Sequence, residues 1–383
     1  MRRRDLLVAS GVGAGLFASG LPRLAFAAPA TDARLVVVIL RGGMDGLAAV
    51  PALGDPDHER ARAGIAIADA LKIDADFGLH PRLEHVARLY AAGEALPIHA
   101  CCVPYHGRSH FDAQNVLENG SPTPYGLKTG WLNRALTALP ARDGDLAVAI
   151  AQTMPVVLRG DARVTSWYPS RLPPPAGDTI DRIEAMYAND PKLAGALAAA
   201  RRVHQGAGSD PESGFPDLMR AAGGFLARPD GPRVALLEST GWDTHANELG
   251  PYGPIERNLR MLDAGVAALA SSLGDAWKRT AVLAMTEFGR TVAMNGTRGT
   301  DHGTGGAAFL LGGAVKGGRV LADWPGLQAN DLLEGRDLRP TTDLRAIMKS
   351  ALVHHLGVPV GHVEDTVFPE SRNVRVAEGL FRT

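Results

Sequence analysis

The chain has 383 residues, of which 45% are hydrophobic and 21% are charged, and its formal net charge is −1. This composition is that of a globular protein with one large α/β domain or two smaller ones. Because no basic run occurs after the first four residues, the sequence argues against nucleic-acid binding. Its two cysteines, Cys101 and Cys102, are adjacent in an apolar run, so we expect burial rather than a disulfide scaffold or a redox pair.

Residues 1–27 have the pattern of a twin-arginine signal peptide. Arginines at positions 2–4 precede a pair of leucines, and a stretch rich in glycine and alanine continues to about Leu21. Residues 25–27 (Ala-Phe-Ala) form a small-x-small cleavage site. The many glycines and Pro22 argue against a stable membrane anchor. We therefore expect a periplasmic or secreted protein whose export partner is the twin-arginine translocon.

The remaining chain, 28–383, predicts a single α/β domain. Residues 34–40 are an aliphatic run typical of a strand buried on both faces. An amphipathic helix over 82–93 and a second strand over 95–103 complete a βαβ unit. A short strand is expected at 147–151, followed by a helical insertion near 156–229, where proline-rich and Gly/Ser-rich loops flank an alanine-rich helix.

Regular alternation of strands and helices then resumes. We expect strands at 234–238, 280–285 and 306–312, an amphipathic helix at 255–273 and a closing helix at 344–356. The whole pattern predicts a doubly wound, mostly parallel sheet with helices on both faces. Ligands of such sheets bind at the carboxyl ends of the strands.

Polar clusters occur at these strand ends. Asp243 and His245 follow one predicted strand, Glu287 follows the next, and His302 precedes the strand after that. Carboxylate and imidazole groups are ligands of transition metals. The structural alternatives are a polar loop with a helix cap for the first pair, an ion pair of Glu287 with Arg290, and a surface turn around His302.

Two further clusters extend this set. Asp45 follows the first strand, where it is either a metal ligand or a turn residue before a glycine. Ser109 precedes a predicted helix over 111–118, with Asp112 three residues later, which is the pattern of a capping box. A hydroxyl at a helix N-terminus is also a candidate nucleophile. Arg108 beside it is placed to hold an anionic group.

The order of these motifs resembles a known family. Arg-Gly-Gly-Met-Asp-Gly, Arg-Ser-His-Phe-Asp-Ala-Gln, Gly-Trp-Asp-Thr-His, Thr-Glu-Phe-Gly-Arg-Thr and Asp-His-Gly-Thr-Gly follow one another as in the twin-arginine-exported bacterial family of domain of unknown function number 1501. That family is placed in the alkaline phosphatase and sulfatase-like superfamily, and its own activity is not established. The resemblance implies that fold for 28–383.

The superfamily resemblance also implies roles for particular residues. It makes Ser109 the nucleophile, with Arg108 and His110 as catalytic neighbours. The implied metal ligands are Asp45, Asp243, His245, Glu287 and His302. Where the superfamily has Asp-His, this chain has Glu287 and Phe288. One metal site therefore lacks a ligand unless His106, His110 or Asp301 supplies it, and we expect one divalent ion (Zn, Mn, Fe or Ca) rather than two.

Two functions remain open at this point. The first is a metal-dependent hydrolase of phosphate or sulfate esters, acting on an anionic small-molecule or polymer substrate. The alternative is a catalytically degenerate protein of the same fold with a binding or scaffold role, which Phe288 favours.

Overall fold

Every residue that the structure describes falls between Thr31 and Thr383. The computed structural model describes residues 32–140, 145–169, 177–190, 193–195, 197–198, 214–250 and 252–382. The predicted signal peptide, residues 1–27, lies outside these ranges. Within them, no helix is long and apolar enough to cross a lipid bilayer.

The centre of the unit is an eight-stranded sheet with the order β10-β4-β9-β8-β1-β7-β5-β6. All neighbouring strands are parallel except β9, which runs antiparallel to both β4 and β8. This arrangement confirms the predicted mostly parallel α/β fold. The strands are β1 (Arg34–Leu40), β4 (Ala95–Cys102), β5 (Ala147–Ile150), β6 (Val164–Trp167), β7 (Val234–Ser239), β8 (Thr280–Met285), β9 (Gly306–Leu311) and β10 (Thr342–Asp343). A separate two-stranded sheet pairs β2 (Leu71–Lys72) with β3 (Gly78–Leu79).

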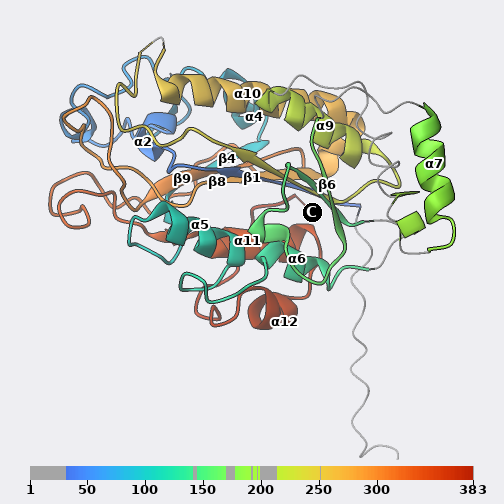
Figure 1. Cartoon of the computed structure of the whole chain (residues 1–383). Coiled ribbons are helices and arrows are strands. Elements are labelled where there is room, and N and C mark those ends of the chain that lie inside the picture. Colours follow the sequence, from blue (N-terminus) through green and yellow to red (C-terminus); the bar gives the residue numbers. More distant parts are fainter. Residues whose placement is uncertain are drawn as a thin grey trace, which may run out of the picture. The chain divides into compact units, whose positions relative to one another are not determined.

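Helices cover both faces of the sheet, as Figure 1 shows. Successive residues of β1 point to opposite faces, so that Val36 and Val38 belong to one apolar core and Leu35 and Val37 to the other. The first face carries α2 (Gly46–Ala49), α4 (Glu84–Ala91), α9 (Phe215–Ala227) and α10 (Pro254–Leu273); the second carries α5 (His110–Asn119), α6 (Trp131–Leu136) and α11 (Leu344–Ser350). Shorter helices are α3 (His58–Ala61), η1 (Val156–Leu158), η2 (Gly274–Arg279), η3 (Ala351–His355), α12 (Val360–His362) and η4 (Val363–Val367).

The region near 156–229, predicted as a helical insertion, contributes partly to the main layers. Strand β6 adds to β5 at one edge of the sheet, and α9 packs along α10. Helix α7 (Gly177–Tyr187) lies between β6 and α9 in the chain, and Figure 1 shows it at the side of the unit. The residues at 170–176 and 199–213 lie outside the described ranges.

The direction of β9 decides which segments meet at the site. Strands β1, β7 and β8 are parallel, so their carboxyl ends lie at one edge of the sheet. Because β9 is antiparallel to β8, its amino end lies at that same edge. The segment before β9, which contains His302, therefore joins the segments that follow β1, β7 and β8.

Candidate metal centre

Three histidines converge on one carboxylate oxygen at this edge. Oδ1 of Asp243 lies 3.1 Å from Nε2 of His245 and 3.3 Å from Nε2 of His302. Nε2 of His110 is 3.4 Å from the same oxygen. The Nε2 atoms of His245 and His302 are 3.0 Å apart. His110, Asp243 and His302 each offer a ligand atom, and these atoms lie within 4.8 Å of one another. The structure thus brings together four of the residues predicted from the sequence.

Two of these histidines are held at Nδ1 by carboxylates. Nδ1 of His110 is 2.8 Å from Oε1 of Glu287, and Nδ1 of His245 is 3.1 Å from Oδ1 of Asp301. An ionised carboxylate only accepts hydrogen bonds, so Nδ1 donates and Nε2 of a neutral ring presents its lone pair. Histidines that bind metals commonly donate their other ring nitrogen to such an acceptor, which fixes the tautomer and the orientation of the ring.

The third histidine is held by a backbone carbonyl. Nδ1 of His302 lies 2.9 Å from the carbonyl oxygen of Arg108. Arg108 has a φ of 57°, a left-handed conformation that is uncommon for residues other than glycine and is often found at functional sites. Its guanidinium contacts Asp337 at 2.8 Å and Glu334 at 2.7 Å. The guanidinium that was predicted to hold an anionic group is therefore engaged by two carboxylates.

With Nδ1 of each ring already bonded, the three Nε2 atoms are left near Oδ1 of Asp243. Nε2 of His110 is inaccessible to solvent and has no hydrogen-bond partner among the described residues. Zn–N bonds of about 2.0–2.1 Å place neighbouring ligands of a tetrahedral site about 3.3 Å apart, close to the separations seen around Asp243. The residues therefore fit a divalent metal. Three nitrogens and one oxygen suit Zn, Mn or Fe better than Ca, which prefers oxygen ligands.

Asp243 is kept ionised by Arg290. Nη1 of Arg290, whose side chain is fully buried, lies 2.7 Å from Oδ1 of Asp243. Partial burial acts to raise the pKa of Asp243, but the hydrogen bond and charge of Arg290 outweigh it, so the pKa is lowered. Arg290 was considered as a partner of Glu287; it pairs with Asp243 instead and also donates to the backbone carbonyl of Thr300.

Glu287 lies behind His110 and is completely buried. Its Oε1 accepts hydrogen bonds from Gly42 N and Gln114 Nε2, each at 2.9 Å, in addition to His110. Burial acts to raise the pKa of Glu287, but these bonds, that of His110 first, lower it; in turn the bond to Glu287 raises the pKa of His110. The ring of Phe288 packs against His110, with centroids 4.7 Å apart. The imidazole of His110, from α5, therefore lies beside Phe288, which follows β8 in the chain.

Ser109 stands at the N-terminus of α5, directly before His110. Its Oγ accepts from the backbone N–H of Asp112 at 3.5 Å, which is the contact expected of a helix cap. Asp112 also accepts from the hydroxyl of Tyr105 at 3.0 Å. The cap that the sequence indicated is therefore present, and it leaves the proposed nucleophilic role of Ser109 as a prediction.

Asp45 has partners of its own, away from the histidines. Its Oδ1 caps α2 by accepting from Leu47 N and Ala48 N, and its Oδ2 is 2.7 Å from Nη2 of Arg62. Both side chains are buried. Burial acts to raise the pKa of Asp45, but the charge of Arg62 and a hydrogen bond with Glu248 lower it. None of its described hydrogen bonds reaches the three histidines.

Some residues that support the centre were not identified from the sequence. Gln114 bridges Glu287 and Arg41, whose Nη1 lies 2.9 Å from Oε1 of Gln114. Gln114 is four residues after His110 on the same helix, and this spacing could have indicated that both face the same neighbour. Arg62 and Glu248 carried no local signal, because their partners are distant in the sequence.

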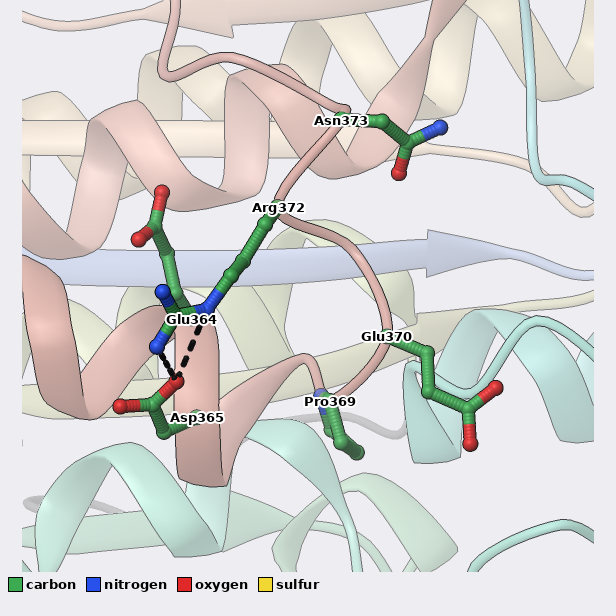
Figure 2. A pocket seen from close by; sticks show the side chains of 6 residues that line it. All are labelled: Glu364, Asp365, Pro369, Glu370, Arg372 and Asn373. Carbon is green, nitrogen blue, oxygen red and sulfur yellow. Dashed lines mark hydrogen bonds and ion pairs between the residues drawn. The ribbon is translucent and has the colours of Figure 1, made fainter.

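Among the described residues, cavities lie outside the centre itself. One, of about 440 Å³, is lined by the residues labelled in Figure 2, where Arg372 points toward Asp365; it contains none of the predicted site residues. Another, of about 430 Å³, includes Asp301 in its lining and therefore adjoins the histidines.

The chain matches one protein-family model over most of its length. Residues 32–367 match the model of a family described as "Protein of unknown function (DUF1501)". No curated protein matches the chain significantly.

Several solved structures are similar at low identity. One is a protein in the alkaline phosphatase superfamily from Vibrio parahaemolyticus, with 12% identity and a TM-score of 0.46, covering 86% of this chain and 67% of that one. Another is the zinc complex of the C-terminal periplasmic domain of EcEptC from Escherichia coli, with 11% identity and a TM-score of 0.38, covering 74% of this chain and 73% of that one. A third is the PsFucS1 sulfatase from Pseudoalteromonas sp., with 13% identity and a TM-score of 0.40, covering 94% of this chain and 74% of that one.

Proposed function

Since the chain belongs to the DUF1501 family, whose description assigns no activity, we propose a function from the site itself: a metal-dependent hydrolase of phosphate or sulfate esters. The observation that carries the proposal is the convergence of three imidazole Nε2 atoms on Oδ1 of Asp243. One divalent ion would be held by His110, Asp243, His245 and His302. Such an ion polarises an ester oxygen and lowers the pKa of a nearby hydroxyl or water.

The protein's own groups prepare this centre. Glu287, Asp301 and the carbonyl oxygen of Arg108 orient the three rings, and Arg290 keeps Asp243 ionised. Hydrolysis adds water across the ester bond. The oxygen of water becomes part of the released phosphate or sulfate, and a proton passes to the departing alkoxide. Ser109, at the N-terminus of α5, is the candidate for a first attack at phosphorus or sulfur. In that route its Oγ would form a bond to phosphorus or sulfur as the bond to the alkoxide breaks, and its proton would pass to the alkoxide. Water would then cleave the bond to Oγ, which releases phosphate or sulfate and restores the serine hydroxyl.

The sequence pattern of residues 1–27 supports the further proposal that the protein is exported through the twin-arginine translocon and works in the periplasm or outside the cell. Export of an already folded chain would allow the metal to be bound before translocation.

A binding or scaffold role is the second candidate. It is favoured by the engagement of the Arg108 guanidinium with Asp337 and Glu334, since that group is then less available to an anionic substrate.

A hydrolysis panel separates the two. Protein loaded with Zn, Mn or Fe is assayed with aryl phosphate and aryl sulfate esters, alongside the variants His302→Ala and His354→Ala. We expect hydrolysis that falls at least about 100-fold in His302→Ala, because a ligand is lost, and that is unchanged in His354→Ala. The absence of turnover with every ester and metal would support the binding role.

A further inference from the structure

The cavity of about 430 Å³ beside the metal centre lies between α3, the loop over 291–295 and the loop over 327–336. We infer that this cavity holds the alcohol part of the ester, and that the preferred substrate carries an apolar group of aryl or branched-alkyl size there. This inference rests on the proposed function and extends it to the class of substrate.

Two residues of the cavity wall touch the histidines directly. Asp301 accepts from Nδ1 of His245 at 3.1 Å. Arg336 donates from Nη2 to the backbone carbonyl of His302 at 2.9 Å. A single imidazole ring therefore separates the cavity wall from the atoms that converge on Asp243. The cavity therefore adjoins the centre on the side of His245 and His302.

The charged groups of the lining already have partners. Arg336 pairs with Asp337 at 3.0 Å, and Arg60 pairs with Asp57 at 2.6 Å. Their guanidinium groups are therefore less available to a second anion. This pairing assigns the anionic part of the ester to the histidine centre rather than to the cavity.

The uncharged part of the wall combines the polar residues Thr291 and Asn295 with apolar side chains. Among the apolar ones, Met294 is 37% exposed, Leu332 is half-buried and Leu327 is buried. Exposed apolar surface of this kind gains free energy when an apolar ligand covers it. At about 30 Å³ for a water-sized group, the volume accommodates about ten to fifteen non-hydrogen atoms, which is the size of a substituted aromatic ring.

The test compares two non-hydrolysable ligands, phenylphosphonate and methylphosphonate, by calorimetric titration of the zinc-loaded protein. Methylphosphonate reports on the centre alone, whereas phenylphosphonate also reaches the cavity. We expect the phenyl compound to bind about tenfold to a hundredfold more tightly, as burial of an aromatic ring predicts.

Two variants at an exposed position of the cavity rim localise the effect. Ala329→Trp fills the cavity and is expected to abolish the phenyl preference while leaving the Kd of methylphosphonate unchanged. Ala329→Ser leaves the cavity open and should keep the preference. A phenyl preference that persists in Ala329→Trp, or that is absent from the wild type although methylphosphonate binds, would overturn the inference alone. Failure of both ligands to bind the wild type would overturn the proposed function and the inference with it.

Discussion

At the scale of single residues, the orientation of the three histidines depends on hydrogen-bond acceptors that lie behind the rings, away from Oδ1 of Asp243. Glu287 and Asp301 occupy Nδ1 of His110 and His245, and the carbonyl oxygen of Arg108 occupies Nδ1 of His302. These acceptors leave the three Nε2 atoms as lone-pair donors close to Oδ1 of Asp243. The chemistry of the site is therefore set by its supporting shell as much as by the ligands.

The first prediction concerns Glu287. Replacing Glu287 with Gln keeps the size of the side chain but removes the charge that holds His110. Metal affinity, measured by competition with a chromogenic chelator, is expected to fall about 10- to 100-fold. Glu256→Gln, which alters an ion pair with Arg82, is the matched control and should leave affinity unchanged. Equal affinity in Glu287→Gln and wild type would show that Glu287 does not support the ligand.

The second prediction concerns the buried carboxylates Asp45 and Glu248, which share Arg62. Burial raises the pKa of Glu248 well above 4.5, and the charge of Asp45 adds to this. The folded protein therefore holds a proton that the unfolded chain releases above about pH 4.5. The stability that this proton contributes is complete below that pH and is lost as the pH rises through the folded value.

Glu248→Gln mimics the protonated side chain and does not titrate. In urea unfolding of EDTA-treated protein, we expect the variant to match wild type at about pH 4.5 and to exceed it by about 1–3 kcal/mol at pH 8.5. A difference that does not change with pH would contradict the assignment of a bound proton to Glu248.

At the scale of elements, α5 brings both the cap and an imidazole to the site. Its N-terminus is fixed by Ser109, and its next residue is His110. The antiparallel strand β9 then delivers His302 to the same edge. Because periodicity is local, sequence patterns predicted α5 and the strands β1, β4, β5, β7, β8 and β9, but not the short strands β2, β3, β6 and β10.

The same patterns could not predict three contacts. The pairing of Asp45 with Arg62, the placement of Glu287 behind His110 and the bond between Arg290 and Asp243 join residues 17, 177 and 47 positions apart. Each depends on how loops cross the sheet edge. The residue types of a metal site were thus predictable, whereas the division between ligands and supporting groups required the three-dimensional arrangement.

The third prediction separates the two roles of Ser109. Ser109→Ala removes both the hydroxyl and the cap, and is expected to lower the free energy of unfolding by about 1 kcal/mol. Ser109→Asn restores a good capping group but has no hydroxyl. Its stability should therefore return to that of wild type, whereas hydrolysis should be lost in both variants. Full hydrolytic activity in Ser109→Asn would show that Ser109 is only a cap and that water attacks directly.

At the scale of the whole molecule, the sheet joins segments from residues 45 to 302 at one edge. Binding of a metal by the loop after β7, the first residue of α5 and the segment before β9 links these elements to one another. A ligand that binds only the folded state stabilises it in proportion to the logarithm of its concentration over Kd. We therefore expect the centre to contribute to the stability of the whole unit as well as to its chemistry.

The central claim is that one metal ion is bound by a set that includes His110. The direct measurement is the metal content of purified protein after equilibration with zinc and removal of unbound ion, compared for wild type, His110→Ala and His106→Ala. We predict one equivalent per chain in wild type and in His106→Ala, and close to none in His110→Ala. No bound metal in wild type, two equivalents, or an unchanged content in His110→Ala would contradict the account.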